Sequence, residues 1–76
     1  MITDEIKELM DAEPFKPIRI VLDERSAFTV THTDYLMISP DRLTVILYDE
    51  SGRFKILNTE QIKIVELAGP TPPKPQ

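Results

Sequence analysis

The sequence predicts a small, mostly β domain with one N-terminal helix, folded as a small barrel or a curled antiparallel sheet of about five strands. Near the N-terminus the apolar residues recur with helical spacing, at Ile2, Ile6, Leu9 and Met10. From residue 18 onward, short β-branched and aromatic stretches alternate with polar turn sequences. The chain has 76 residues, a length that suits one domain, which we assign to residues 1–67.

The N-terminal helix is expected from Asp4 to Ala12. Thr3 is a suitable N-cap, and Asp4 and Glu5 place carboxylates in the first turn, where the helix dipole favours negative charge. Pro14 disfavours helical geometry in the residue before it, so the helix should end ahead of that proline.

Several later segments have the composition and alternation of strands, and polar turns separate most of them. These segments are Ile18 to Leu22, Phe28 to His32, Tyr35 to Ile38, Leu43 to Tyr48, Arg53 to Leu57 and Ile62 to Leu67. Gly52 is expected to take positive φ in the hairpin turn that follows Tyr48. The polar residues 58–61 are expected to form one tight, 3₁₀-like turn.

Period-two alternation in the strands and the apolar stripe of the helix together predict the core. The expected core residues are Ile6, Leu9, Phe15, Ile18, Ile20, Leu22, Phe28, Val30, Leu36, Ile38, Leu43, Val45, Leu47, Phe54, Ile56, Ile62 and Ile64. A core of this size stabilises a fold by only about 3–5 kcal/mol, so self-association would be a useful further source of stability.

Residues 68–76 differ in composition from the rest of the chain, since four of these nine residues are proline. We expect them to form a disordered or polyproline II tail.

The formal net charge of −4 resides on the N-terminal helix, because residues 1–13 hold five acids and one lysine while the rest of the chain is balanced. Nucleic-acid binding needs basic groups to neutralise phosphates, so this distribution disfavours it. The chain has no cysteine, which excludes disulfides and thiolate zinc sites. No apolar run is long enough for a membrane span and no signal-peptide pattern is present, so a cytoplasmic location is expected.

The order of the expected elements resembles that of small SH3-like barrels, and most closely the Sm-like ones. Shared features are an N-terminal helix, a long bent second strand from Ser26 to Ile38, a hairpin and a 3₁₀ turn before the last strand. The Asp…Asn and Arg-Gly signals of Sm-like loops do not occur in residues 39–42 and 57–60. The resemblance therefore carries no RNA-binding residue over to this chain.

The chain also resembles a set of short uncharacterised bacterial proteins. The residues that carry this resemblance are Pro14, Phe15 and Pro17, then Phe28, Val30, His32, Asp34 and Tyr35, then Ile38, Ser39 and Pro40, and finally Tyr48, Asp49, Gly52, Arg53 and Phe54. One departure is Asp23-Glu24, where the pattern has Asp-Gly, so the first hairpin should use a link other than a type I′ turn. The resemblance implies no activity.

Catalytic chemistry is not expected. His32 is the only histidine, and Asp34 lies two residues further along the chain. Together they would supply two ligands, which are too few for a metal site. With only two glycines, the chain has no phosphate-cradling loop. We interpret residues 31–40 as a strand corner fastened by His32 and Asp34, in which Asp34 accepts bonds from backbone N–H groups. His32, Asp34 and Tyr35 are candidate interaction residues.

The expected function is that of a small non-catalytic binding or regulatory module that works through protein–protein contacts and needs no cofactor. Its partner is either another protein or a further copy of the chain, in a dimer or a ring, and the contact could use the acidic helix, a strand edge or a sheet face. The alternative is RNA or single-stranded DNA binding by a basic strip. That strip would comprise Arg19, Lys55 and Lys63, with Tyr48 stacking on a base.

Overall fold

The computed structural model describes residues 1–68 and is mostly β with one N-terminal helix, as the sequence predicts. It has six strands rather than about five. In chain order the elements are α1 (Ile2–Met10), β1 (Ile18–Asp23), β2 (Ser26–Val30), the 3₁₀ helix η1 (Thr33–Tyr35), β3 (Leu36–Ile38), β4 (Thr44–Tyr48), β5 (Phe54–Asn58), the 3₁₀ helix η2 (Thr59–Gln61) and β6 (Ile64–Leu67). The proline-rich tail predicted for residues 68–76 lies, apart from Ala68, outside the described residues.

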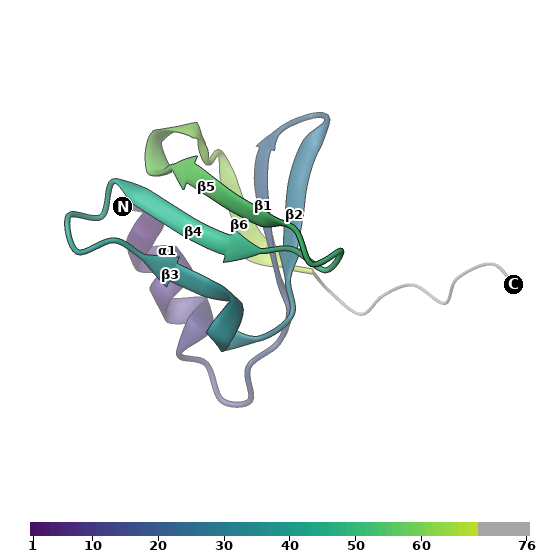
Figure 1. Cartoon of the computed structure of the whole chain (residues 1–76). Helices are drawn as coiled ribbons and strands as arrows, with labels where there is room; N and C mark the ends of the chain where they lie inside the picture. Colours follow the sequence, from purple (N-terminus) through teal and green to yellow (C-terminus); the bar gives the residue numbers. More distant parts are fainter. Residues whose placement is uncertain (69–76) are drawn as a thin grey trace, which may run out of the picture.

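The strands form two antiparallel sheets of three strands each. Sheet A has the order β2-β1-β6, and sheet B has the order β3-β4-β5. The chain passes from one sheet to the other through η1, so the long bent strand expected from Ser26 to Ile38 is interrupted at that point. In Figure 1, strands β3, β4 and β5 lie in front, with α1, β1 and β6 behind them. No closed barrel is formed by residues 1–68.

The core lies between the inner faces of the two sheets and α1. Its buried apolar residues are Ile6, Ile18, Ile20, Val30, Leu36, Val45, Leu47, Leu57 and Ile62, and Ile2, Leu9, Met10, Phe15, Leu22, Phe28, Ile38 and Val65 pack around them. The single buried side chain of α1 that is apolar, Ile6, brings the helix into this core. Most of the predicted core residues are therefore inside.

Four predicted core residues are exposed: Leu43, Phe54, Ile56 and Ile64. In β5 the alternation is shifted by one residue, because Val45 and Leu47 of β4 pair with Leu57 and Lys55. A shift of one residue moves every side chain of a strand to the opposite face. Phe54 and Ile56 consequently point outward, while Leu57, which the sequence prediction left out, is buried.

The other two residues, Ile64 and Leu43, are exposed for separate reasons. In β6, Val65 is the partner of the buried Ile20, so it faces the core and its neighbour Ile64 faces outward. Leu43 precedes β4 and belongs to the loop rather than to the strand.

The helix also begins earlier than predicted. Met1 rather than Thr3 is the N-cap and makes no side-chain cap bond, and Thr3 lies inside the helix with 3% exposure. The helix ends at Met10, where the N–H of Asp11 donates to the carbonyl of Lys7 at 2.9 Å. It thus stops before Pro14, as the sequence predicts.

The turns follow the sequence prediction more closely. Gly52 has φ +84°, and residues 59–61 form η2, whose capping box joins Asn58 and Gln61. Glu24 and Arg25 connect β1 to β2 without positive φ, so the first hairpin is not of type I′. An irregularity in register between Val21 and Asp23 accommodates this link.

Candidate protein-contact surface

Sheet B turns one face to the core and the other to solvent. Because Leu36, Val45, Leu47 and Leu57 point inward, the alternate residues of the three strands point outward. We call these outward residues the open face: Met37, Thr44, Ile46, Tyr48, Phe54, Ile56 and Asn58. Figure 1 shows sheet B on the near side of the molecule, with no other described element in front of it.

The centre of the open face is apolar. Met37, Ile46 and Ile56 are direct cross-strand partners and form one row across the sheet. In the next row Tyr48 is paired with Phe54, and their ring centroids are 5.5 Å apart in a tilted arrangement that aromatic pairs favour. Met37 is 60% exposed, Ile56 63%, Phe54 50% and Tyr48 48%. Scattered apolar residues are normal on a protein surface, whereas a contiguous apolar set across three strands is a candidate interaction site.

None of the seven residues of the open face carries a charge. The outer face of sheet A is different, since the central Arg19 has Glu66 and Thr29 as its cross-strand partners. Charged residues on the solvent side of a sheet keep that side in water. Of the two sheets, sheet B is therefore the one whose outer face is suited to being covered.

The predicted corner lies between β2 and β3. His32 is the N-cap of η1, and its Nδ1 accepts a hydrogen bond from the N–H of Asp34 at 3.0 Å. His32 therefore stabilises the corner, as predicted, and its side chain is exposed. The carboxylate of Asp34 lies 3.6 Å from that same nitrogen, and accepts no backbone bond among the described residues. The predicted role of Asp34 as a backbone acceptor is wrong.

The structure brings three of the predicted site residues around one hollow. Asp34 and Tyr35 of the corner lie with Tyr48, Asp49 and Glu50 in the lining of a 570 Å³ depression next to the open face. His32 is outside this lining, and its ring packs against Tyr35 with centroids 5.7 Å apart. Tyr48 belongs both to the hollow and to the open face.

The predicted basic strip is not assembled. Arg19 is exposed on the outer face of sheet A, whereas Lys55 is on β5, beside Leu57 on the inner face, with its Nζ 5.6 Å from the centroid of the Phe28 ring. Lys63 lies in the link between η2 and β6, where its N–H donates to the carbonyl of Val21. Arg19 and Lys55 therefore lie on different faces of the fold, and Tyr48 is on the open face, which includes neither.

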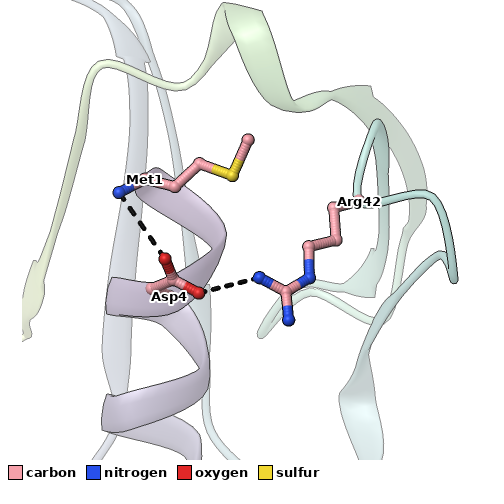
Figure 2. Close-up of polar contacts among 3 residues, drawn as sticks. All are labelled: Met1, Asp4 and Arg42. Atoms are coloured by element: carbon pink, nitrogen blue, oxygen red, sulfur yellow. Dashed lines mark hydrogen bonds and ion pairs between the residues drawn. The ribbon is translucent and has the colours of Figure 1, made fainter.

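A second, smaller cavity of 290 Å³ lies between α1 and the loop that follows β3. Lys7 and Arg42 are at this cavity, and Met10, Leu36, Ile38 and Pro40 supply apolar walls. Arg42 takes φ +64°, and its Nη1 donates to Oδ1 of Asp4 at 2.9 Å, as Figure 2 shows. The other carboxylate oxygen of Asp4 lies 3.7 Å from the N-terminal amine of Met1. The Arg42–Asp4 pair thus attaches the loop to the helix at the protein surface.

Three aspartates stabilise the turns of the fold. The Asp49 carboxylate accepts bonds from the Ser51 hydroxyl and from the N–H groups of Ser51 and Arg53, and these bonds hold its pKa below the ordinary value of 3.8. The Asp41 pKa is lowered in the same way, first by the Ser39 hydroxyl at 2.6 Å and then by the N–H of Leu43. The N–H of Arg25 lowers the pKa of Asp23. Their roles are structural, since each bonds its own turn.

Comparisons of the chain with protein-family models, with curated proteins and with solved structures give no match. Among residues 1–68 no group of three or more His, Cys, Asp or Glu side chains is placed to hold a metal ion. Within the same range, no helix has the length and apolar character needed to cross a membrane.

Of the open face, only Tyr48 is among the site residues predicted from sequence, although a signal for the whole face exists. Residues 43–48 read Leu-Thr-Val-Ile-Leu-Tyr, in which Val45, Ile46 and Leu47 are consecutive apolar residues. A strand that is apolar on both sides is typical of a sheet whose two faces are both covered. The sequence predicts no further element that would cover the outer side of this strand, and this mismatch is the signal for the open face.

Proposed function

We propose that this chain is a non-catalytic binding module that acts through protein–protein contacts, and that the open face is its contact surface. The single observation that carries the proposal is the charge-free apolar face formed by β3, β4 and β5. The element order supports the further proposal that sheets A and B are the two halves of an open SH3-like or Sm-like barrel. The sequence features described above also support the proposal that the protein is bacterial and cytoplasmic.

The composition of the face defines the chemistry of the partner. Its centre consists of aromatic residues and of Met and Ile side chains, and Thr44 and Asn58 form a polar border at one end. Interfaces commonly combine an apolar, aromatic- and methionine-rich centre with a polar rim and few central charges. A protein surface that presents uncharged apolar side chains is the matching partner.

Photocrosslinking tests the proposal inside the producing cell. A benzoylphenylalanine at position 54 places the photoreactive group on the open face, and the same residue at position 64 places it on the outer face of sheet A. Both positions lie on edge strands and are about half exposed, at 50% and 49%. Protein adducts that form from position 54 and not from position 64, identified by mass spectrometry, are the expected result. Equal yields from both positions, or no protein adduct at all, would contradict the proposal.

RNA or single-stranded DNA binding remains the second candidate, and it has less support. Its cations Arg19 and Lys55 lie on different faces, and its stacking residue Tyr48 borders a hollow that also holds Asp34, Asp49 and Glu50. Carboxylates next to a stacking ring repel the phosphates of the strand it would bind. Salt-sensitive binding of single-stranded RNA at 50 mM salt, lost in Tyr48→Ala, would favour this candidate over the first.

A further inference from the structure

We propose that the partner of the open face is a second copy of the same chain, so that two sheets B pack face to face about a two-fold axis. This inference rests on the proposed function and specifies its partner. The dimer would be a sandwich in which sheet A and α1 of each copy form the outer layers.

The absence of charge on the open face favours a second copy over a foreign protein. In a two-fold dimer the same patch occurs on both sides, so a charged residue near the axis would meet its own like charge. All seven positions of the face are uncharged, including the three in the central row, Met37, Ile46 and Ile56. A foreign interface has no such requirement and commonly uses opposite charges for specificity.

The size of the patch sets the strength of the expected dimer. Aromatic side chains bury about 150–250 Å² each, so Tyr48 and Phe54, each about half exposed, contribute roughly 200 Å² together. Met37 and Ile56 are more exposed, and the four residues then offer apolar area on the order of 400 Å², within the range of functional patches. A standard interface buries about 800 Å² on each partner, which the rim residues would have to complete. We therefore expect a monomer–dimer equilibrium rather than a permanent dimer.

The shape of the face also suits a like partner. Two sheets can pack face to face about 10 Å apart when both present apolar side chains along aligned strands. Ile46 lies on the central strand β4, between Met37 and Ile56, so its side chain would be near the middle of the sandwich. The second sheet would then supply the missing cover for β4, which is apolar on both sides.

Sedimentation velocity of the full chain across a concentration series tests the inference with two matched variants. Ile56→Glu places a charge on the open face, and Ile64→Glu makes the same change on the outer face of sheet A, again on an edge strand. The wild type and Ile64→Glu should shift from one-chain to two-chain mass as concentration rises, while Ile56→Glu stays at one-chain mass. Circular dichroism checks that both variants are folded, which their exposed positions favour.

A crosslinking experiment provides a second, independent measurement. The chain has no cysteine, so each substitution introduces a single thiol. A short bismaleimide should join two copies of Met37→Cys, Ile46→Cys or Ile56→Cys, and it should join Thr29→Cys, on the outer face of sheet A, at least tenfold less. An equal yield from Thr29→Cys would overturn the inference.

The outcomes separate this inference from the proposed function. If the wild type keeps one-chain mass up to about 1 mM, where even a millimolar Kd would be detected, the second copy is not the partner. Adducts to a different protein from position 54 would in that case leave the proposed function in place. If the chain is monomeric and position 54 gives no protein adduct, both are overturned.

Discussion

At the scale of single residues, two buried threonines differ in what their hydroxyl groups do. Oγ1 of Thr59 donates to the carbonyl of Arg42 at 3.0 Å, and so helps to hold a residue with positive φ. Oγ1 of Thr3 is buried in α1 without a hydrogen-bond partner among the described residues. An unpartnered buried hydroxyl costs stability.

Thr3→Val is therefore expected to raise the free energy of unfolding by about 1 kcal/mol, since valine keeps the shape and removes the unpartnered group. Thr59→Val should lower it by about 1 kcal/mol, because the carbonyl of Arg42 loses its donor. Urea unfolding at low protein concentration measures both. A loss of stability in Thr3→Val as large as that in Thr59→Val would show that the Thr3 hydroxyl is satisfied, for instance by a bound water.

The corner residues give a second prediction at this scale. His32→Ala removes the side-chain acceptor for the N–H of Asp34 and should lower stability by about 0.5–1 kcal/mol, the usual cost of losing a cap. Asp34→Ala should change it by less than about 0.5 kcal/mol, because its carboxylate is exposed and makes no backbone bond among the described residues. Thermal unfolding at pH 7 would distinguish the two. A larger loss of stability in Asp34→Ala than in His32→Ala would instead show that the Asp34 carboxylate stabilises the corner.

At the scale of the elements, the sequence was informative wherever local chemistry decides. The positive φ of Gly52, the 3₁₀ turn at residues 59–61 and the end of α1 before Pro14 follow from turn residues and from proline. The existence of each strand also follows from composition. Local signals of this kind do not depend on which partner the element finally meets.

The face that β5 buries could not be predicted in the same way. Ile56 and Leu57 are adjacent, so alternation allows either one to face the core. The register with β4 decides, because Val45 and Leu47 are inward and pair with Leu57 and Lys55. Residues 49–53 set that register through the length of the hairpin loop. For the same reason the sequence prediction places two residues of the open face, Phe54 and Ile56, in the core.

The turns should make the stability of the elements sensitive to acid. The folded pKa values of Asp41 and Asp49 lie below 3.8 because of bonds to their own turns. A depressed carboxyl pKa gives stability that is complete above the unfolded value and is lost as the pH falls through the folded value. The midpoint of urea unfolding should therefore be constant from pH 7 to about 5 and fall below pH 4. Asp49→Asn should be less stable at pH 7 and show a smaller loss in acid, and an unchanged pH profile would contradict this account.

At the scale of the whole molecule, the core between the two sheets and the open face of sheet B should differ sharply in their response to truncation. Ile20 is fully buried at 0% exposure, whereas Ile56 is 63% exposed. Replacing a buried Ile by Ala costs about 2–5 kcal/mol, which is comparable with the total stability of a domain of this size.

Ile20→Ala is accordingly expected to unfold most of the protein at 37 °C, while Ile56→Ala should leave the dilute monomer within about 0.5 kcal/mol of the wild type. Circular dichroism melts at low protein concentration measure the stability of the monomer, and melts at high concentration add the contribution of any dimer. A stability loss in Ile56→Ala that appears only at high concentration would be the sign of a dimer. A large loss at every concentration would mean that Ile56 is part of the monomer core.

The position of β6 has a consequence for how the protein is made. Sheet A is completed by β6, which pairs with β1. In the described chain β1 is the first strand and β6 is the last element. During synthesis on the ribosome, β1 and sheet B therefore emerge before the strand that completes the core exists. In that interval the inner face of sheet B still lacks the core contacts of Ile62 and β6, and the open face is uncovered. We therefore expect the nascent chain to be prone to association through this apolar β-structure until β6 has emerged.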